Sequence, residues 1–256
     1  MNDKLTEEEF LKQYDADVYK KPSVTVDMLI FTIMDKEESN YRKLPEKSLK
    51  ILMVKRKNHP FIGKWALPGG FVSIDESLDD AAARVLKNET NVNNVYMEQL
   101  YTWGDVDRDK RTRVISVSYL ALVDSSALSL IPGNDEEDAR WFTVSYKVIE
   151  DNKIELKLNN NDEELSSNSI AFDHGKIIEY AIDRLKNKIS YTDIALNLMP
   201  ELFTLTELQQ VYQLIEGREL LAAAFRRKIS NMVIETNEYT KDVGHRPSKL
   251  YKKAIF

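Results

Sequence analysis

The residues with the clearest chemical potential lie between positions 67 and 89. The segment Leu67-Pro-Gly-Gly70 ends in two glycines, which allow a backbone to approach a ligand closely. Positions 85, 88 and 89 are three and four residues apart, so on a helix they share one face. That face carries Val85, Asn88 and Glu89, and therefore a single carboxylate. Mg²⁺ is a hard cation that prefers several charged oxygens, so this pattern favours a phosphate-binding site that holds metal poorly.

The spacing of this segment resembles the Nudix box. Gly70 is followed by five residues and Glu76, then by seven residues and Arg84, with Leu86 and Glu89 beyond. The preceding Leu67-Pro-Gly-Gly70 and the later Ala139-Arg-Trp-Phe142 also look like Nudix landmarks. The resemblance implies that three glutamates, at the positions of Val85, Asn88 and Glu89, would hold divalent cations against a diphosphate. Two of them are missing here, so the scaffold for metal-assisted hydrolysis is incomplete.

Two hypotheses follow from this incomplete box. In the favoured one, a Nudix domain binds a nucleotide diphosphate without cutting it. In the other, a remnant site hydrolyses its ligand with Glu76, Glu89 and a loop acid such as Glu136 or Glu137. The first expects no catalytic residue, no required cofactor and only weak metal binding at Glu89, whereas the second needs Mg²⁺.

The candidate effector-binding residues combine the double glycine, the retained box residues and nearby arginines. They are Arg56, Gly69, Gly70, Glu76, Arg84, Glu89, Arg108 and Arg111. For the pair of Arg84 and Glu76 we favour a structural role, in which the two side chains fasten the loop to the helix. Trp65, Tyr101 and Trp103 could stack on an adenine, but aromatic side chains at such positions more often belong to the core.

The elements that must position these residues read as mixed strand and helix. A buried strand is predicted at 24–34 and another at 49–56, because β-branched and apolar residues run together there. A helix is predicted over 77–90, with Ser77 as its N-cap and Asn91 as its left-handed terminator. The other predicted elements are a broken strand at 65–72, strands at 95–103, 113–123, 139–142 and 151–158, a polar loop at 159–168 and a helix at 173–187.

The last third of the chain predicts a different arrangement. Thr204-Leu-Thr-Glu207 is a capping box that opens a helix ending before Gly217. A second helix is expected over 219–230, with Leu220, Leu221, Phe225 and Ile229 facing a small core. Strands are predicted at 232–236 and 248–252, separated by a basic loop. Helix, tight turn, helix and a two-stranded hairpin are the order of a winged helix-turn-helix.

Charge is distributed unevenly along the 256 residues. The chain has 36 Lys and Arg against 42 Asp and Glu, a net charge of −6, which by itself argues against nucleic-acid binding. However, residues 218–256 hold nine Lys and Arg and four Asp and Glu, so this tail carries +5 and the body −11. The predicted DNA contacts are basic residues of the tail: Arg218, Arg226, Arg227, Lys228, Lys241, Arg246 and Lys249. The Ala222-Ala-Ala224 run can touch a thymine methyl group but cannot donate a hydrogen bond to a base edge.

Four further stretches resemble the Nudix-related transcriptional regulators, in which a degenerate Nudix domain precedes a winged helix. They are Tyr19-Lys-Lys-Pro-Ser-Val-Thr-Val-Asp27, Ala171-Phe-Asp-His174, Phe203-Thr-Leu-Thr-Glu-Leu-Gln209, and Phe225-Arg-Arg-Lys228 together with Gly244-His-Arg-Pro247. The resemblance implies an α+β chain with a Nudix α/β/α sandwich around a mixed sheet at 1–187 and a winged helix-turn-helix at 188–256. It also implies a homodimeric regulator that binds a double-stranded DNA operator and senses a nucleotide or sugar such as ADP-ribose. The alternative is a hydrolase of ADP-ribose or a related nucleoside-diphosphate sugar with an accessory C-terminal domain.

Composition excludes several other classes. The chain has no cysteine, so disulfides and thiolate chemistry are excluded, and its three histidines are far apart in sequence. The longest apolar stretch, 28–34, is far shorter than the ~20 residues of a membrane helix. We therefore expect a cytoplasmic protein without a membrane partner.

Overall fold

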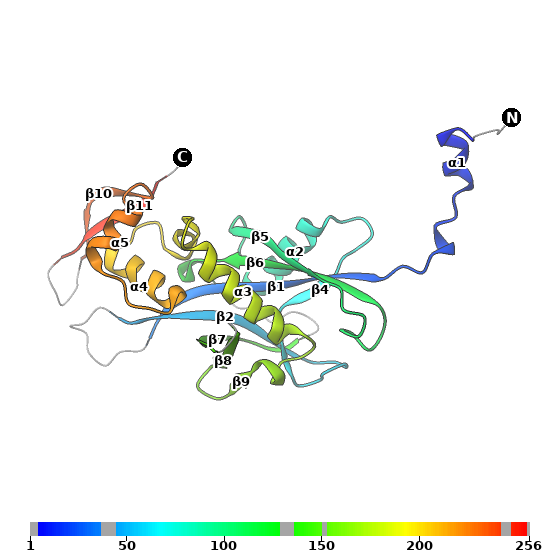
Figure 1. Cartoon of the computed structure of the whole chain (residues 1–256), viewed down its shortest axis with the longest axis horizontal. Coiled ribbons are helices and arrows are strands. Elements are labelled where there is room, and N and C mark those ends of the chain that lie inside the picture. Colours follow the sequence, from blue (N-terminus) through cyan, green and yellow to red (C-terminus); the bar gives the residue numbers. More distant parts are fainter. Residues whose placement is uncertain (1–4, 37–44, 129–135, 150–152, 242–246, 255–256) are drawn as a thin grey trace.

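The computed structural model describes residues 5–36, 45–128, 136–149, 153–241 and 247–254, with only the backbone of residues 136 and 137. Its main body is a mixed sheet between helices, and a smaller helical unit with a two-stranded ribbon lies at one end (Figure 1). The α+β class and the predicted order of domains are confirmed.

The sheet contains the described strands β1 to β9. Their bounds are β1 Ser23–Asp35, β2 Lys47–Arg56, β3 Trp65–Ala66, β4 Gly69–Phe71, β5 Tyr96–Trp103, β6 Val114–Leu122, β7 Glu136–Val148, β8 Ile154–Asn159 and β9 Glu164–Ser166. The order across the sheet is β5-β6-β1-β2-β7-β8-β9, with β3 beside β2 and β4 beside β1. Strand β1 runs parallel to β6 and antiparallel to β2 and β4, so the sheet is mixed.

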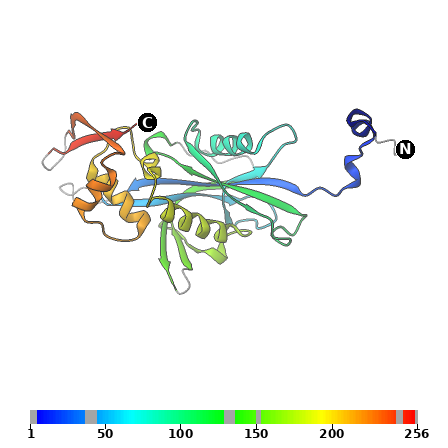
Figure 2. The ribbon, with the colours of Figure 1, turned by 45° about the horizontal axis from the view of Figure 1, so that its top comes forward.

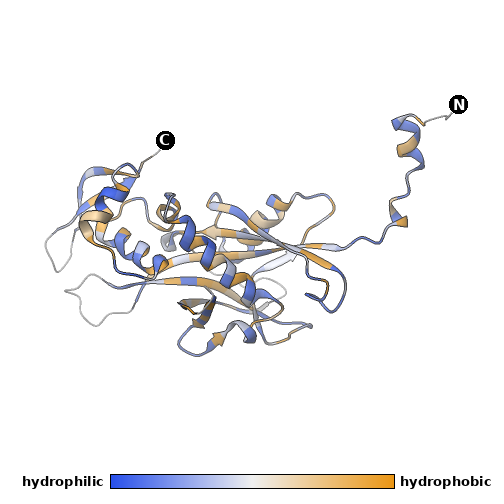
Figure 3. Ribbon diagram, in the orientation of Figure 1, coloured by the Kyte–Doolittle hydropathy of each residue, from blue (hydrophilic) through white to orange (hydrophobic). Residues whose placement is uncertain are grey.

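Two helices cover the two faces of the sheet (Figure 2). Helix α2 (Leu78–Thr90) packs on one face and helix α3 (His174–Lys188) on the other. Alternation along β1 explains this arrangement: Val26, Met28 and Ile30 join the α2 core, whereas Leu29, Phe31 and Ile33 join the α3 core. Figure 3 shows the hydrophobic residues running along the central strands. The sandwich is therefore confirmed.

The C-terminal unit has the predicted order of elements. It contains the 3-10 segment η5 (Ile194–Leu198), α4 (Leu205–Glu216), α5 (Ala222–Ile229), β10 (Val233–Tyr239) and β11 (Lys249–Lys253). Thr204 and Glu207 form the reciprocal capping box of α4, and Gly217 ends the helix with φ +68°. An antiparallel contact between Phe203 and Tyr251 ties the start of this helix pair to the ribbon.

Several element predictions were wrong in detail. Helix α5 begins at Ala222 instead of 219, so Leu221 is the residue before the helix and is 81% exposed instead of buried. The loop predicted at 159–168 contains the short strand β9, because its Leu165 packs into the core. Strand β7 extends beyond the predicted 139–142, and the helix α1 (Glu7–Gln13), fixed by a Thr6 capping box, was not predicted.

The C-terminal unit packs directly on the sheet. The core on the α3 face continues without a break into Phe203, Leu208, Tyr212 and Phe225 of the winged helix. The Tyr146 hydroxyl of β7 donates a 2.6 Å hydrogen bond to the Ile215 carbonyl, which lies in the last turn of α4. Strand β2 contributes a second polar contact, since Lys47 Nζ lies 3.5 Å from the Glu207 carboxylate. Strands β2 and β7 therefore both contact α4, β2 through Lys47 and β7 through Tyr146.

Replacing Gly217 with alanine should destabilise the protein more than replacing Gly63. Both glycines have positive φ, +68° and +75°, where an L side chain costs roughly 1–2 kcal/mol. A Cβ on Gly217 would also lie 3.3 Å from the Tyr146 hydroxyl, whereas one on Gly63 would meet nothing within 4 Å. Urea unfolding should therefore show a larger loss for Gly217→Ala, and equal losses would contradict close packing between Tyr146 and the α4 terminus.

Candidate functional site

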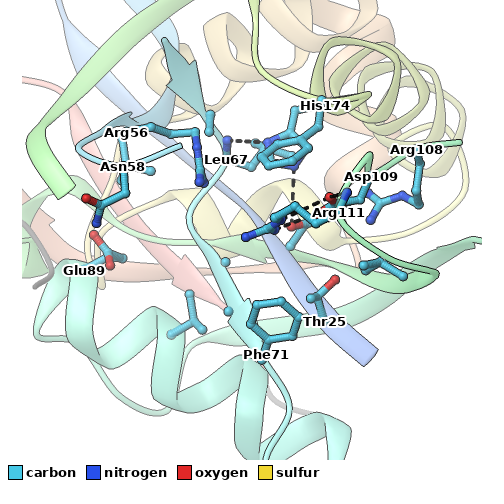
Figure 4. A pocket seen from close by; sticks show the side chains of 18 of the residues that line it. Thr25, Arg56, Asn58, Leu67, Phe71, Glu89, Arg108, Asp109, Arg111 and His174 are labelled. Carbon is cyan, nitrogen blue, oxygen red and sulfur yellow. Dashed lines mark hydrogen bonds and ion pairs between the residues drawn. The ribbon is translucent and has the colours of Figure 1, made fainter. Parts of the chain in front are cut away.

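A cavity of about 550 Å³ lies between the β4–α2 segment, the end of β2 and the 104–113 loop (Figure 4). This volume is within the range of ordinary small-molecule sites. Its lining residues are Thr25, Asp27, Val54, Arg56, Asn58, His59, Ala66, Leu67, Gly69, Gly70, Phe71, Arg84, Val85, Asn88, Glu89, Arg108, Asp109, Arg111, Val114, Phe172 and His174.

The buried carboxylate of Asp27 organises the floor of the cavity. Asp27 on β1 is 6% exposed and accepts hydrogen bonds from the Ser116 hydroxyl at 2.5 Å and from Arg108 Nη2 at 3.3 Å. Arg108 also donates twice to Asp173, from Nε at 3.0 Å and from Nη2 at 2.7 Å. These bonds leave Arg108 almost completely buried, so its charge is matched by two carboxylates.

His174 joins this network to the segment that precedes the double glycine. Its Nδ1 accepts a 2.9 Å hydrogen bond from the Leu67 backbone N–H, and its Nε2 lies 3.6 Å from Asp27 Oδ1. Burial lowers the pKa of His174 in spite of the opposing effect of Asp27. The imidazole is therefore neutral at pH 7, with Nδ1 as the acceptor.

Gly69 lies against the same carboxylate. A Cβ at this position would be 2.7 Å from the Val26 carbonyl oxygen and 2.8 Å from Asp27 Oδ1, so only glycine fits. Gly70 has more room, because the nearest atoms to its Cβ position, on Val85 and Arg84, lie at 3.7 and 3.8 Å. Gly69 therefore allows close packing of β4 against Asp27 of the protein, and not the close approach of a ligand.

Aromatic rings and arginines alternate at the cavity wall. The guanidinium of Arg56 lies 4.9 Å from the centre of the Phe172 ring, and its Nε donates to the Pro60 carbonyl at 2.7 Å. Arg111 lies 5.8 and 6.0 Å from the rings of Phe71 and Phe172. Arg111 also donates to the buried Asp109 carboxylate, from Nε at 3.1 Å and from Nη2 at 2.8 Å. Its side chain is still 45% exposed, whereas that of Arg108 is 5% exposed. Arg56 and Arg111 are therefore the arginines that can face an anionic ligand.

The loop before α2 is fastened by the predicted pair. Arg84 donates to the Glu76 carboxylate from Nε at 3.0 Å and Nη2 at 2.6 Å, and Glu76 also accepts from the Ser73 backbone N–H at 2.8 Å. The hydrogen bonds from Arg84 and Ser73 lower the pKa of Glu76 to about 2. A third bond from Arg84 reaches the Phe71 carbonyl, so this ion pair fixes the loop.

Among the side chains that the structure describes, the α2 face beside the cavity offers one carboxylate to a divalent metal, that of Glu89. Val85 and Glu89 are buried beside the cavity, Asn88 is exposed, and Val85 contributes no oxygen. Within the described ranges, no group of three or more His, Asp or Glu side chains is placed to hold a metal ion. The side chains of Glu136 and Glu137, the loop acids of the hydrolase hypothesis, lie outside the described part of the chain.

The structure brings most of the predicted effector residues together. Seven of them line the cavity: Arg56, Gly69, Gly70, Arg84, Glu89, Arg108 and Arg111. Glu76 does not line it and serves to hold Arg84. Trp65 and Trp103 are buried, and Trp65 packs on Phe142 in the core. Sequence reasoning missed Asp27, Phe172 and His174 as members of the site, although a lone aspartate inside the apolar strand at 24–34 was a usable signal.

The predicted DNA contacts occupy several environments. Arg226 and Arg227 are exposed on α5, and neither forms an ion pair with another described residue. Lys228 pairs with the buried carboxylate of Glu216 at 3.0 Å, and Arg218 pairs with the same carboxylate at 2.7 Å although its side chain is 70% exposed. Lys249 pairs with a glutamate of β10, and Lys241 is exposed two residues after β10 ends. Arg246 lies outside the described residues.

The titration of His174 gives a testable pH dependence. Because its folded pKa lies below the usual 6.5, the unfolded chain binds a proton that the folded chain excludes. The resulting stabilisation is present above pH 6.5 and is lost as the pH falls below that value. Asn at position 174 keeps an acceptor for Leu67 but does not titrate. Denaturant unfolding should show the advantage of wild type over His174→Asn shrinking from pH 7.5 to 5.5, whereas a constant difference would contradict burial of a neutral imidazole. Replacing the exposed His59 with Asn provides the control.

Comparisons with known families match both parts of the chain. Residues 195–252 match the NrtR DNA-binding winged helix domain, and residues 42–158 match the NUDIX domain. The "ADPR responsive transcriptional repressor NtrR" of Acinetobacter baylyi is 36% identical over 253 residues, which are 98% of this chain and 89% of that protein. An ADP-ribose pyrophosphatase of Methanocaldococcus jannaschii is 34% identical over 176 residues, 69% of this chain and 81% of that one.

Solved structures show the same architecture over nearly the whole length. A MutT/nudix family protein from Enterococcus faecalis is 30% identical with a TM-score of 0.78, covering 98% of this chain and 94% of that chain. Shewanella oneidensis NrtR complexed with a 27mer DNA is 32% identical with a TM-score of 0.69, covering 90% and 93%. The NUDIX domain of the same protein complexed with ADP ribose is 34% identical with a TM-score of 0.52, covering 71% and 99%. With its Nudix-box spacing, its winged helix and a relative of this identity along the full chain, the protein belongs to the NrtR family of Nudix-related transcriptional regulators.

Proposed function

We propose that this chain is a DNA-binding transcriptional regulator whose Nudix domain binds ADP-ribose, or a closely related nucleotide or sugar, without hydrolysing it. The observation that carries this proposal is a cavity that is lined by arginines but has only one carboxylate, Glu89, on the α2 face where the Nudix box would hold metal. The same chain also contains a winged helix that matches a DNA-binding domain. Arg56 supplies positive charge for a diphosphate, and so does Arg111, which pairs with Asp109 on one side but stays 45% exposed. The neighbouring rings supply flat apolar surface for a base.

The same residues assign a role to each part of the cavity. The carboxylates of Asp27 and Asp173 hold Arg108, so we assign Arg108 a structural contribution to the wall. Gly70 lines the cavity from strand β4 and has no side chain of its own, so we assign it to the surface that a phosphate approaches. Glu89 is retained at one metal position, and we assign it at most weak cation binding.

Communication between the two parts follows from the strands they share. Strand β2 carries Arg56 at the cavity and Lys47 at the contact with α4. Strand β7 pairs with β2 and carries Tyr146, which bonds to the last turn of α4. A ligand that shifts the cavity end of these strands changes the seating of the winged helix, which is the differential contact that linkage between two sites requires.

We further propose the assembly in which this chain acts. A homodimer would present two winged helices to a palindromic operator with half-sites about one DNA turn, or a multiple of it, apart. The domain division after residue 187 assigns α3 to the sensor, since its buried face packs on the sheet. Light scattering that gave only monomers on the operator would contradict the dimer.

No described helix is long and apolar enough to cross a membrane. We propose that the regulator acts in the cytoplasm.

The sensor and hydrolase hypotheses predict different results when the protein is mixed with ADP-ribose. Binding is measured by calorimetry, and hydrolysis by the amount of intact ADP-ribose that is recovered. For a sensor, ADP-ribose binds in the presence of EDTA and is recovered intact after incubation with Mg²⁺ or Mn²⁺. Turnover of ~1–10³ s⁻¹, the ordinary range of enzymes, would contradict the sensor and support the alternative of an ADP-ribose pyrophosphatase.

A matched pair of variants tests why the metal is dispensable. Val85→Glu with Asn88→Glu would place three carboxylates on the face that now carries only Glu89. We expect ADP-ribose affinity to become dependent on Mg²⁺ in this double variant and to remain independent of it in Val85→Gln with Asn88→Gln. An effect of Mg²⁺ on the Gln pair or on wild type would contradict the proposed loss of the metal site.

The DNA-binding face is tested by the salt dependence of one arginine. Arg227→Ala should weaken binding to all duplexes by a similar factor and reduce the slope of log K against log salt by about 0.9, the value for one lost phosphate contact. Lys20→Ala, an exposed cation far from the winged helix in sequence, should leave the slope unchanged. An unchanged slope for Arg227→Ala would place DNA on another surface.

A further inference from the structure

The N-terminal end of α5 is exposed and apolar. Phe225 and Ile229 are buried against α4, and the ring of Phe225 lies 5.2 Å from that of Tyr212. Leu221 is 81% exposed, and all three alanines that follow it, 222–224, are exposed as well. We define Leu221–Ala224 as the apolar strip. Its four side chains lack any group that could hydrogen-bond to a base.

An exposed leucine at this position has no structural reason. Leu221 is the N-cap of α5 and makes no side-chain capping bond, in a position where Ser, Thr, Asp or Asn would stabilise the helix. The backbone just before the strip is anchored to α4, because the Gln209 amide donates a 2.7 Å hydrogen bond to the Leu220 carbonyl.

The charges around the strip indicate what covers it. Arg226 and Arg227 follow it on the same helix, and both are exposed without an ion pair among the described residues. Arg218 precedes the strip, is 70% exposed and pairs with Glu216, and the exposed Glu219 lies between Arg218 and the strip. Ala223 and Arg227 are four residues apart, so they share the face opposite the buried Phe225 and Ile229. Phosphates line both edges of the DNA major groove, and thymine methyl groups are the apolar groups on its floor. Apolar side chains with arginines beside them are complementary to such a surface.

We propose that the apolar strip is a specificity-determining surface that reads thymine methyl groups in the major groove, with Leu221 as its principal contact. This inference rests on the proposed function, since it requires α5 to enter the groove as the second helix of a helix-turn-helix does. Discrimination at these base pairs then comes from burial of methyl groups, while Arg226 and Arg227 bind the flanking phosphates.

The experiment uses a duplex that the full-length protein selects from a random library, and the same duplex with thymines replaced one at a time by deoxyuridine, which lacks only the methyl group. Wild type should bind about fourfold more weakly for each contacted methyl that is removed, as expected for one buried carbon. Leu221→Ala should bind the thymine duplex more weakly and lose its sensitivity to deoxyuridine at one position of each half-site.

The controls separate reading of bases from other effects. Alanine is also a poor N-cap, so Leu221→Ala leaves α5 capping unchanged, and equal thermal unfolding midpoints will verify the fold. Arg227→Ala should lose affinity by the same factor on thymine and deoxyuridine duplexes, as a phosphate contact does.

Three results would overturn the inference: no effect of any deoxyuridine on wild type, an equal effect on wild type and Leu221→Ala, or a change of oligomeric state in Leu221→Ala without a change in thymine preference. The last result would identify the strip as a contact between copies of the chain. Failure to select any duplex would instead contradict the proposed function itself.

Discussion

The buried carboxylate of Asp27 is the interaction on which the sensor depends. It lies on the central strand β1 and receives bonds from Ser116 on β6 and Arg108 of the 104–113 loop, while His174 of α3 lies beside it. A buried charge is tolerated only when such partners surround it, so removing one partner would leave the others unsatisfied. This constraint also explains Gly69, because a larger residue would collide with Asp27. The hydrogen bonds and contacts around Asp27 thus fix the shape of the cavity floor.

The proposed function separates phosphate binding from phosphate chemistry. The residues that we assign to diphosphate binding belong to the double glycine, the fastened loop and the arginines over aromatic rings, and the structure gathers them at the cavity. The feature that would activate water, a set of carboxylates on one helix face, is reduced to Glu89. An enzyme uses ligand contacts to stabilise a transition state. In a sensor, the same contacts can favour one position of a second domain over another. The continuous core between the sheet and the winged helix gives that bias a physical route.

Much of this arrangement was predictable from local sequence signals. The caps at Ser77, Asn91 and Thr204 and the apolar run of β1 place the main elements to within a few residues. Seven cavity residues were also found from their charge or motif spacing, but the charged Asp27 was missed. Phe172 and His174 were not found as cavity residues, because the neighbours that bring them to the cavity come from β2, β3 and the following loop, distant in sequence. The burial of Leu221 was predicted wrongly, since helical periodicity was extended over residues that precede the helix.

Thermodynamic linkage between the cavity and the winged helix is measured most directly by reciprocal titration. Saturating ADP-ribose should change operator affinity, and saturating operator should change ADP-ribose affinity by the same factor, within the ~5–150-fold range of allosteric coupling. Operator affinity that stays the same with and without bound ADP-ribose, measured by fluorescence anisotropy at one salt concentration, would contradict it.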